Sequence, residues 1–224
     1  FLKWKMISRI SRRLFSNFDF CLTSNLDTLN FLKQLNAKNI INTGNLKLVR
    51  NDNNNEVKNF NSDFLKKKKF WFAASTHDNE EKFCLNAHLL IKENFGNILT
   101  IIAPRHINRV NRIKRLCEEM NLKFQILDKE DLISESSEVV VLNSFGNTYE
   151  YFKFAKSVYI GKSAVKKLEG EGGQNPIDAA RLGCKVYHGP YVYNFREIYE
   201  TLKKLGISHE ISSPDELSSK IIND

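Results

Sequence analysis

The spacing of hydrophobic positions divides the chain into segments of different character. From Phe70 onward, short continuous apolar runs alternate with segments whose apolar residues recur every three or four positions, as in buried strands and amphipathic helices. This pattern predicts strands at 70–75, 97–104, 123–128, 138–144, 157–163, 184–189 and 207–212. It predicts helices at 79–95, 107–121, 148–155, 175–183, 195–206 and 214–222. Such alternation is typical of a mainly parallel sheet with helices on both faces, so we expect one α/β domain over residues 70–224.

The first 50 residues carry the same alternation once. A strand is expected at 18–24, a helix at 25–37 with Ser24 as its N-cap, and a second strand at 38–45.

Residues 1–16 contain five basic residues and no acidic one. The apolar residues Leu2, Met6, Ile10 and Leu14 recur every four positions, which predicts a basic amphipathic helix. Two interpretations stay open: the helix packs through its apolar stripe, or it lies on an anionic membrane surface.

Residues 51–69 are rich in Asn and Lys and show no hydrophobic periodicity, so we expect a linker or solvated loop there. The Lys66–Lys69 run is more typical of a solvated face than of a nucleic-acid site. The predicted organisation is therefore 1–50, a connection at 51–69, and the main domain at 70–224.

Composition and charge narrow the classes of partner. Hydrophobic residues make up 42% of the chain, enough for a packed core, and the net charge of +8 favours anionic ligands. The basic runs lack interleaved aromatic residues, which disfavours nucleic acid. The four cysteines form no CxxC or CxxH pair, so we expect reduced thiols in a cytosolic protein rather than a zinc site. No apolar run approaches the ~20 residues of a membrane span, and the start at Phe1 suggests a piece of a longer chain.

Residues that directly follow the strands are the candidates for chemistry, because parallel α/β sheets bind ligands at the carboxyl ends of their strands. Ser75, Thr76 and His77 follow the first strand of the main domain and lead into a helix; they either hold a phosphate on backbone N–H groups or simply start the helix. Arg105 and His106 follow the next strand, and this arginine either binds a phosphate bidentately or lies at the surface without a ligand.

A glycine-rich segment and a Gly-Pro turn complete the candidates. Gly172 and Gly173 let the backbone approach a ligand closely, although many connections use glycine for other reasons. Asn175 can cap the helix that starts at Pro176. After the strand 184–189, Tyr191 offers a ring that packs either on a base or sugar or on a neighbouring helix.

The order of these motifs resembles the 3-deoxy-D-manno-octulosonic acid (Kdo) transferases. That family carries Ala-Ser-Thr-His followed by acids, as at 74–81, then Pro-Arg-His, as at 104–106. It continues with a Gly-Glu turn before a Tyr-containing helix and with Gly-Gly-His-Asn-Pro-Leu-Glu-Pro-Ala. In this chain the corresponding segments are Gly146-Asn147 and Gly172–Ala179. A later Gly-Pro and Asn-Phe pair, and the Gly-Asn-Leu-Lys of the domain junction, correspond to 189–190, 194–195 and 44–47.

The resemblance implies a GT-B enzyme with two Rossmann-like domains facing a cleft, of which this chain would be the C-terminal, donor-binding half. It implies CMP-Kdo as the donor substrate and neither a metal nor a cofactor. Arg105 and the loop Gly172–Asn175 would hold the phosphate, Ser75 and Thr76 would line the donor pocket, and Asn175 and Asp178 would lie nearest the ribose or sugar. The remaining donor-binding residues implied are His77, His106, Gly146, Asn147 and Gln174.

The resemblance also implies what the rest of the enzyme would do. A lipid A precursor would bind to the N-terminal domain, which would supply the carboxylate base, and residues 1–50 would be the tail of that domain. No catalytic residue is therefore expected in this chain. The enzyme would act in lipopolysaccharide biosynthesis on the cytoplasmic face of the bacterial inner membrane.

Three positions depart from the family pattern. Gln174 stands where the family has His, Asp178 where it has Glu, and Asn147 where the Gly-Glu turn has its acid. Gln donates a hydrogen bond but does not titrate near neutrality. Two other functions stay open: a nucleotide-sugar-binding module without catalysis, and a GT-B transferase or epimerase that uses another donor such as a UDP-sugar.

Overall fold

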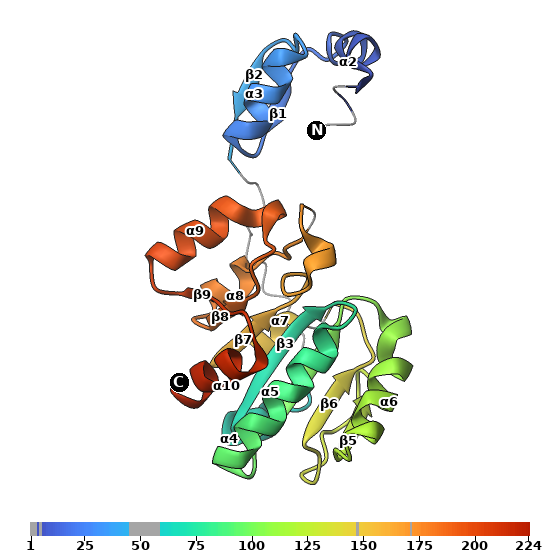
Figure 1. Cartoon of the computed structure of the whole chain (residues 1–224), viewed down its shortest axis with the longest axis vertical. Helices are drawn as coiled ribbons and strands as arrows, with labels where there is room; N and C mark the ends of the chain where they lie inside the picture. Colours follow the sequence, from blue (N-terminus) through green and yellow to red (C-terminus); the bar gives the residue numbers. More distant parts are fainter. Residues whose placement is uncertain (1–3, 5, 45–58, 147, 171) are drawn as a thin grey trace. The chain divides into compact units, whose positions relative to one another are not determined.

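A computed structural model of the chain describes residues 4, 6–44, 59–146, 148–170 and 172–224. The chain forms two compact units, Phe1–Asn55 and Glu56–Asp224. Figure 1 shows the elements of both units.

The larger unit contains a seven-stranded sheet, in the order β5-β6-β4-β3-β7-β8-β9, among its described residues. Every neighbouring pair is parallel. The strands are β3 (Phe70–Thr76), β4 (Leu99–Pro104), β5 (Phe124–Leu127), β6 (Val139–Leu142), β7 (Ser157–Ile160), β8 (Lys185–His188) and β9 (Ser208–Glu210). This arrangement confirms the expected Rossmann-like parallel α/β fold, and it brings the carboxyl ends of all these strands to one edge.

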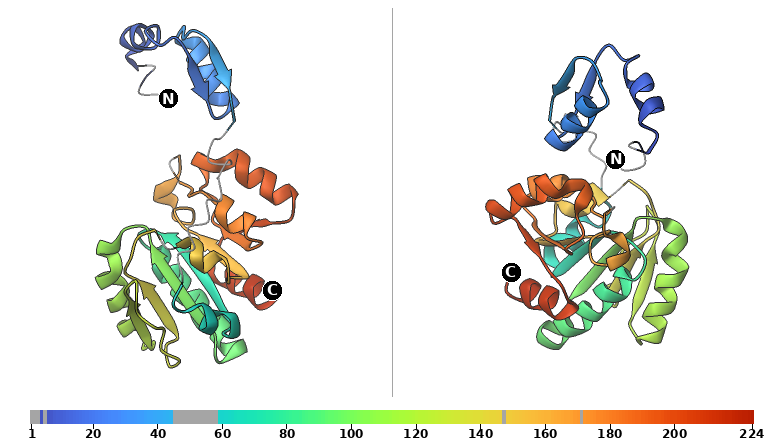
Figure 2. Two further views of the ribbon diagram at one scale, coloured as in Figure 1. Left: turned by 180° about the vertical axis from the view of Figure 1, so that it is seen from behind. Right: turned by 45° about the horizontal axis from the view of Figure 1, so that its top comes forward.

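Helices cover both faces of this sheet, as the continuous apolar strands require (Figures 1 and 2). Along β3, Trp71 and Ala73 point to one core, and Phe72 and Ala74 point to the other. The first core is closed by α5 (Glu80–Phe95), α6 (Val110–Glu119) and α10 (Pro214–Ile222). The second is closed by α4 (Ser62–Lys67), α7 (Thr148–Phe152), α8 (Ile177–Arg181) and α9 (Arg196–Lys204).

Among the described residues, three 3-10 helices complete the larger unit: η2 (Ile107–Arg109), η3 (Lys166–Leu168) and η4 (Tyr193–Phe195). The stretch 51–69 was expected to be a linker or loop, but from residue 59 on it belongs to the larger unit. There α4 forms because Leu65 enters the core with 2% of its surface exposed.

The smaller unit is a βαβ arrangement with one additional helix. Strands β1 (Cys21–Thr23) and β2 (Ile40–Asn42) pair in parallel, and α3 (Leu26–Gln34) connects them. The cap of α3 is Asn25, whose Oδ1 accepts a 2.8 Å hydrogen bond from the Thr28 N–H, so the prediction of Ser24 as N-cap was wrong by one residue. The motif Gly44–Lys47 lies outside the described residues except for Gly44.

The predicted basic amphipathic helix at 1–16 is present as α2 (Ser8–Phe15) over the residues that the structure describes. Its apolar positions are exposed: Met6 to 86%, Ile10 to 66% and Leu14 to 41%. Trp4 and Phe15 contact each other edge to face at 5.9 Å, so part of the apolar surface is covered within the helix region itself. Met6, Ile10 and Leu14, the described part of the stripe, therefore do not pack into a core of this unit. In the described part of the chain, no helix is long and apolar enough to span a bilayer.

Candidate functional site

Three loops that follow neighbouring strands come together at the carboxyl edge of the larger sheet. The Arg105 N–H after β4 donates to the Thr76 carbonyl at the end of β3, at 3.0 Å. On the other side of β3, the Gly161 N–H after β7 donates to the Ala74 carbonyl at 2.8 Å. Residues far apart in sequence thus line one edge, as the parallel topology predicts.

The segment after β3 turns sharply. Ser75 has a positive φ of 56°, and the register with β4 shifts between Ala74 and Thr76. This irregularity lets the His77 ring face the ring of His106, with centroids 5.8 Å apart, while His77 Nδ1 contacts the Ser75 carbonyl at 3.0 Å. The two predicted post-strand histidines therefore form one cluster.

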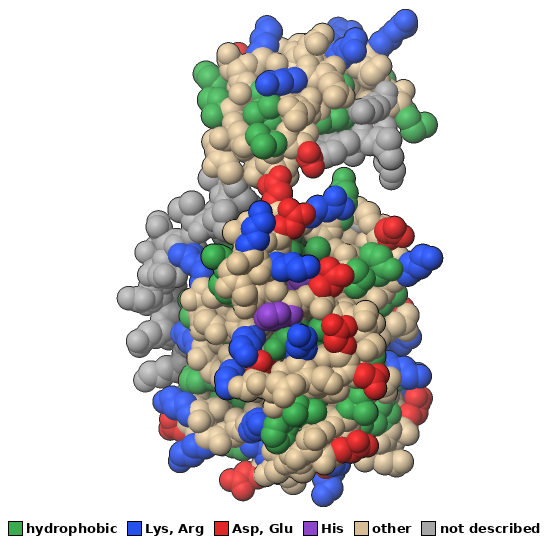
Figure 3. Space-filling model, turned by 60° about the vertical axis from the view of Figure 1, so that its left-hand side comes forward, with side chains coloured by type: hydrophobic (Ala, Val, Ile, Leu, Met, Phe, Trp, Pro, Cys, Tyr) green, Lys and Arg blue, Asp and Glu red, His purple; other side chains and the backbone are tan. Residues whose placement is uncertain are grey.

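The protonation of His77 depends on this surrounding. Burial lowers the pKa of His77 below its usual value, and the charges of Lys162 and His106 act in the same direction. The hydrogen bond to the Ser75 carbonyl and the charge of Glu80 oppose this. The neutral ring is favoured, and a neutral imidazole can donate or accept one hydrogen bond toward a ligand. Figure 3 shows one face of the larger unit on which a histidine side chain is exposed among Lys and Arg side chains.

Glu80 fastens the loop after β7 to the start of α5. Its buried carboxylate accepts hydrogen bonds from the backbone N–H groups of Lys162, Ser163 and Ala164, at 2.6, 2.7 and 2.9 Å. It also accepts the His77 N–H at 2.9 Å and the Tyr159 hydroxyl at 2.9 Å. The acids after His77 were predicted only as part of the family-like segment 74–81, so this role of Glu80 was missed. Four of its five partners lie 79 to 84 positions further along the chain, so no local pattern indicates them.

The second acid of the helix start, Glu81, has a different partner. Its buried carboxylate pairs with the Arg109 guanidinium through two bonds of 2.7 and 2.8 Å, and Arg109 also reaches Asp78 at 3.1 Å. These bonds raise the pKa of Arg109. Burial by itself would raise the pKa of Asp78, but the Arg109 hydrogen bond and the charges of Arg109, Arg112 and Lys167 together lower it below its usual value. Both acids of the first turn are thus engaged within the protein.

The glycine-rich loop lies against the loop after β7 with no room for a side chain. The Gly173 N–H donates to the Lys162 carbonyl at 2.6 Å. A Cβ on Gly172 would meet the carbonyl oxygens of Leu168 and Lys162 at 2.9 Å. Gly173 has a φ of +97°, a conformation that favours glycine. Both glycines are therefore required by close backbone approach.

The residues that follow these glycines are held in place by local bonds. The Gln174 carbonyl accepts the Tyr199 hydroxyl at 3.0 Å, and Asn175 Oδ1 accepts the Ile177 N–H at 3.1 Å. The helix was predicted to start at Pro176 with Asn175 as its cap, but Pro176 is the N-cap and α8 starts at Ile177, so the prediction was wrong by one residue. Asp178 lies half-buried in the first turn of α8.

The predicted donor-site residues lie mainly in the loops at the carboxyl edge of the larger sheet. The structure brings together the segments 75–77, 105–106 and 172–175. Gly146 lies in the exposed loop after β6, next to β4 in the sheet, and has a φ of +84°; Asn147 lies outside the described residues. Lys162 and Ser163 were missed because the expected strand ran to 163, whereas β7 ends at Ile160.

Among the described residues, no group of three or more His, Cys, Asp and Glu side chains is placed to hold a metal ion. The expectation of a reaction without metal or cofactor stays a prediction.

The larger unit is thus a Rossmann-like parallel α/β domain whose carboxyl edge carries two histidines, an arginine and a close-packed glycine loop. The curated relatives are 3-deoxy-D-manno-octulosonic acid transferases. That of Haemophilus influenzae is 27% identical over 183 residues, covering 80% of this chain and 42% of the relative. That of Aquifex aeolicus is 24% identical over 214 residues, covering 96% and 56%. The chain thus spans about half the length of these relatives.

A solved structure supports the fold in the same way. The C-terminal CMP-Kdo binding domain of WaaA from Acinetobacter baumannii has a TM-score of 0.64 and 20% identity, covering 71% of this chain and 81% of that domain. No family model matches the chain. The resemblance to the Kdo transferases that the motifs predicted is confirmed: the chain is similar to these enzymes over most of its own length.

Proposed function

We propose that this chain is the donor-binding half of a glycosyltransferase and binds CMP-Kdo for Kdo transfer. One observation carries the proposal: Arg105, the His77–His106 pair and the Gly172–Gly173 loop converge at the carboxyl edge of the sheet. Anionic ligands of such sheets bind at this edge. The relatives are named Kdo transferases, and the related solved domain is described as CMP-Kdo binding.

The geometry suits stabilisation of a leaving nucleotide phosphate. When the bond between the sugar and CMP breaks, negative charge builds up on the phosphate, and positively charged or N–H donors lower the energy of that state. Arg105 is exposed at the edge and can offer its guanidinium to two phosphate oxygens. Ser75, Thr76 and the Gly172–Asn175 loop would line the remaining sides, with Asn175 and Asp178 nearest the ribose or sugar.

The acids after β3 are not the catalytic base of this proposal. A base needs a carboxylate oxygen within hydrogen-bond reach of the attacking hydroxyl. Glu80 and Glu81 have exposed fractions of 0% and are engaged by backbone N–H groups and by Arg109. The base would come from the acceptor-binding part that the full-length relatives carry.

The finer parts of the proposal concern the acceptor and the location. A lipid A precursor would be the acceptor in lipopolysaccharide biosynthesis, at the cytoplasmic face of the bacterial inner membrane. The exposed apolar residues of α2, with Arg9, Arg12 and Arg13 on the same helix, support peripheral contact with an anionic membrane. Use of a different donor, such as a UDP-sugar, is not favoured by the comparisons.

Nucleotide binding tests the proposal directly. Isothermal titration should detect CMP, with UMP and UDP at least about tenfold weaker. Arg105→Ala should weaken CMP binding by about 10- to 100-fold, because a charged hydrogen bond contributes about 1.5–3 kcal/mol. The matched control is Arg115→Ala on the exposed side of α6, which should leave the affinity unchanged. Equal affinity for CMP and UDP, or an unaffected Arg105→Ala variant, would contradict the proposal.

A further inference from the structure

Lys162 has a backbone conformation that lysine rarely adopts. It follows β7 with a φ of +60°, in the left-handed region where a Cβ approaches the backbone too closely. Other residues of this chain with positive φ are mostly Asn and Gly, which tolerate it. Lysine gains nothing locally from this conformation, so its presence needs another reason.

The backbone of Lys162 joins two parts of the site. Its N–H donates to Glu80 Oε2 and its carbonyl accepts the Gly173 N–H, both at 2.6 Å. These bonds involve only main-chain atoms of residue 162, so a glycine would make them equally well and without strain. The connecting role therefore explains the conformation at 162 but not the lysine side chain.

Lys162 lies beside His77, because the N–H groups of both residues donate to Glu80 Oε2. Its side chain is half-buried; burial lowers the pKa of His77, and the charges of Lys162 and His106 act in the same direction. The carboxyl edge of the sheet thus carries cationic or titratable residues from three strand ends: His77 after β3, Arg105 and His106 after β4, and Lys162 after β7. Positive groups repel one another when they gather, and an anion placed between them relieves that repulsion.

We propose that the Lys162 ammonium group binds an oxyanion of the nucleotide-sugar donor, and that this contact is the reason a lysine occupies a position whose backbone favours glycine. The inference rests on the proposed function. A CMP-sugar acid offers two such oxyanions, the phosphate and the sugar carboxylate, and an ammonium group binds either as a point charge. Lys162 was outside the donor-site residues predicted from the sequence.

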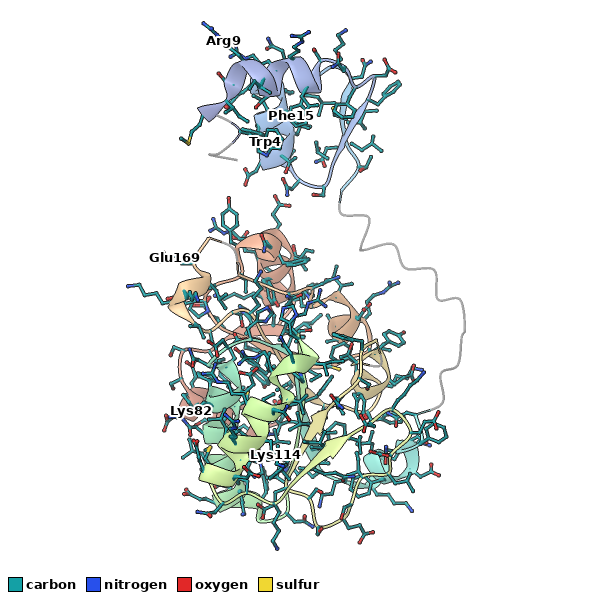
Figure 4. All side chains as sticks on the ribbon, turned by 90° about the vertical axis from the view of Figure 1, so that its right-hand side faces the viewer. Trp4, Arg9, Phe15, Lys82, Lys114 and Glu169 are labelled. Atoms are coloured by element: carbon teal, nitrogen blue, oxygen red, sulfur yellow. The ribbon has the colours of Figure 1, made fainter. Side chains whose placement is uncertain are left out.

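The experiment compares three variants by isothermal titration with cytidine, CMP and CMP-Kdo. Lys162→Gly removes the charge and the strain together, Lys162→Arg keeps the charge, and Lys114→Ala on α6 removes an exposed charge elsewhere (Figure 4). Lys162→Gly should weaken the binding of CMP-Kdo by about tenfold and leave the binding of cytidine unchanged. Lys162→Arg should stay within about threefold of the original chain, and Lys114→Ala should have no effect.

Thermal unfolding separates binding from folding. Lys162→Gly should unfold at the same or a higher temperature, because glycine suits the positive φ. A variant that binds CMP less well while being at least as stable has lost a ligand contact, not its fold. If Lys162→Gly proves less stable, the comparison of Lys162→Met with Lys162→Arg decides, since both keep a side chain and only one keeps the charge.

Each outcome has a definite meaning. If Lys162→Gly binds both CMP and CMP-Kdo more weakly, the Lys162 ammonium group contacts the phosphate. If it binds only CMP-Kdo more weakly, the ammonium group contacts the sugar carboxylate. Equal weakening of cytidine and CMP, or no weakening of any probe, overturns the inference while the proposed function stands. If the unmodified chain binds neither CMP nor CMP-Kdo, the proposed function fails and this inference fails with it.

Discussion

Glu80→Gln is the substitution that most sharply tests how the site is assembled. The Glu80 carboxylate accepts five hydrogen bonds: from the N–H groups of His77, Lys162, Ser163 and Ala164, and from the Tyr159 hydroxyl. Glutamine has the same shape but only one acceptor oxygen, and its NH₂ group donates. Glu80 Oε1 accepts three of the bonds and Oε2 accepts two. Whichever position the NH₂ group of glutamine takes, at least two N–H groups then face this NH₂ group instead of an oxygen.

The expected loss follows from these unpaired donors. Each buried donor left without an acceptor costs about 1–3 kcal/mol, so Glu80→Gln should lower the free energy of unfolding by about 2–6 kcal/mol. Small domains are stable by about 5–15 kcal/mol, so the variant should fold but unfold roughly 5–20 °C lower. Urea unfolding at pH 7 measures the first quantity and calorimetry the second.

A control and a local readout complete this test. Glu93→Gln makes the same chemical change at an exposed position of the same helix and should stay within about 0.5 kcal/mol of the original chain. In Glu80→Gln, amide hydrogen exchange should accelerate at the pair that faces the NH₂ group, either His77 and Lys162 or Ser163 and Ala164; it should not accelerate at these amides in Glu93→Gln. A loss below about 1 kcal/mol with unchanged exchange at these amides would refute the reasoning.

Two further predictions concern the core and the edge of the sheet. His88 is fully buried, its Nδ1 contacts Thr100 Oγ1 at 2.8 Å, and burial lowers its pKa to about 4. The unfolded value is about 6.5, so the protein loses stability as the pH falls from about 6.5 toward 4, by about 3 kcal/mol in total. Between pH 7.5 and 4, the free energy of unfolding of His88→Asn, measured in urea, should therefore fall by about 3 kcal/mol less than that of the original chain. Parallel pH profiles of the two proteins would disprove this. Gly161→Ala would place a Cβ 2.5 Å from the Ser75 carbonyl oxygen and 2.6 Å from Thr76 Cα, so it should cost about 1–3 kcal/mol or more and weaken CMP binding. Gly183→Ala, with φ +82° and open space around it, should cost only about 1 kcal/mol and leave CMP binding intact; equal effects of the two would contradict the steric argument.

The pattern of apolar runs was enough to predict the main fold. Periodicity along a strand or helix is a local property, and alternation of the two constrains the sheet to be parallel. That topology alone places Thr76, Arg105 and the glycine loop at one edge, because parallel strands end on the same side. The site could therefore be outlined from the positions that follow the strands, without coordinates.

Local patterns failed where a distant partner decides the conformation. The strand expected to reach residue 163 ends at Ile160, because the N–H groups of residues 162–164 turn to the Glu80 carboxylate instead of to a neighbouring strand. The helix α4 was missed for a similar reason: its polar, Lys-rich sequence has no periodicity, and burial of Leu65 against the sheet stabilises it.

The sequence by itself determined the order of the elements, the parallel sheet and the edge at which a ligand would bind, since each follows from spacing along the chain. Only the tertiary structure decided the partners of Glu80 and Glu81, the left-handed backbone at Lys162 and the contact between His77 and His106. The physical reason is that hydrogen bonds and charge interactions depend on distances across space, and residues separated by 28 to 84 positions come within bonding distance only when the sheet has formed.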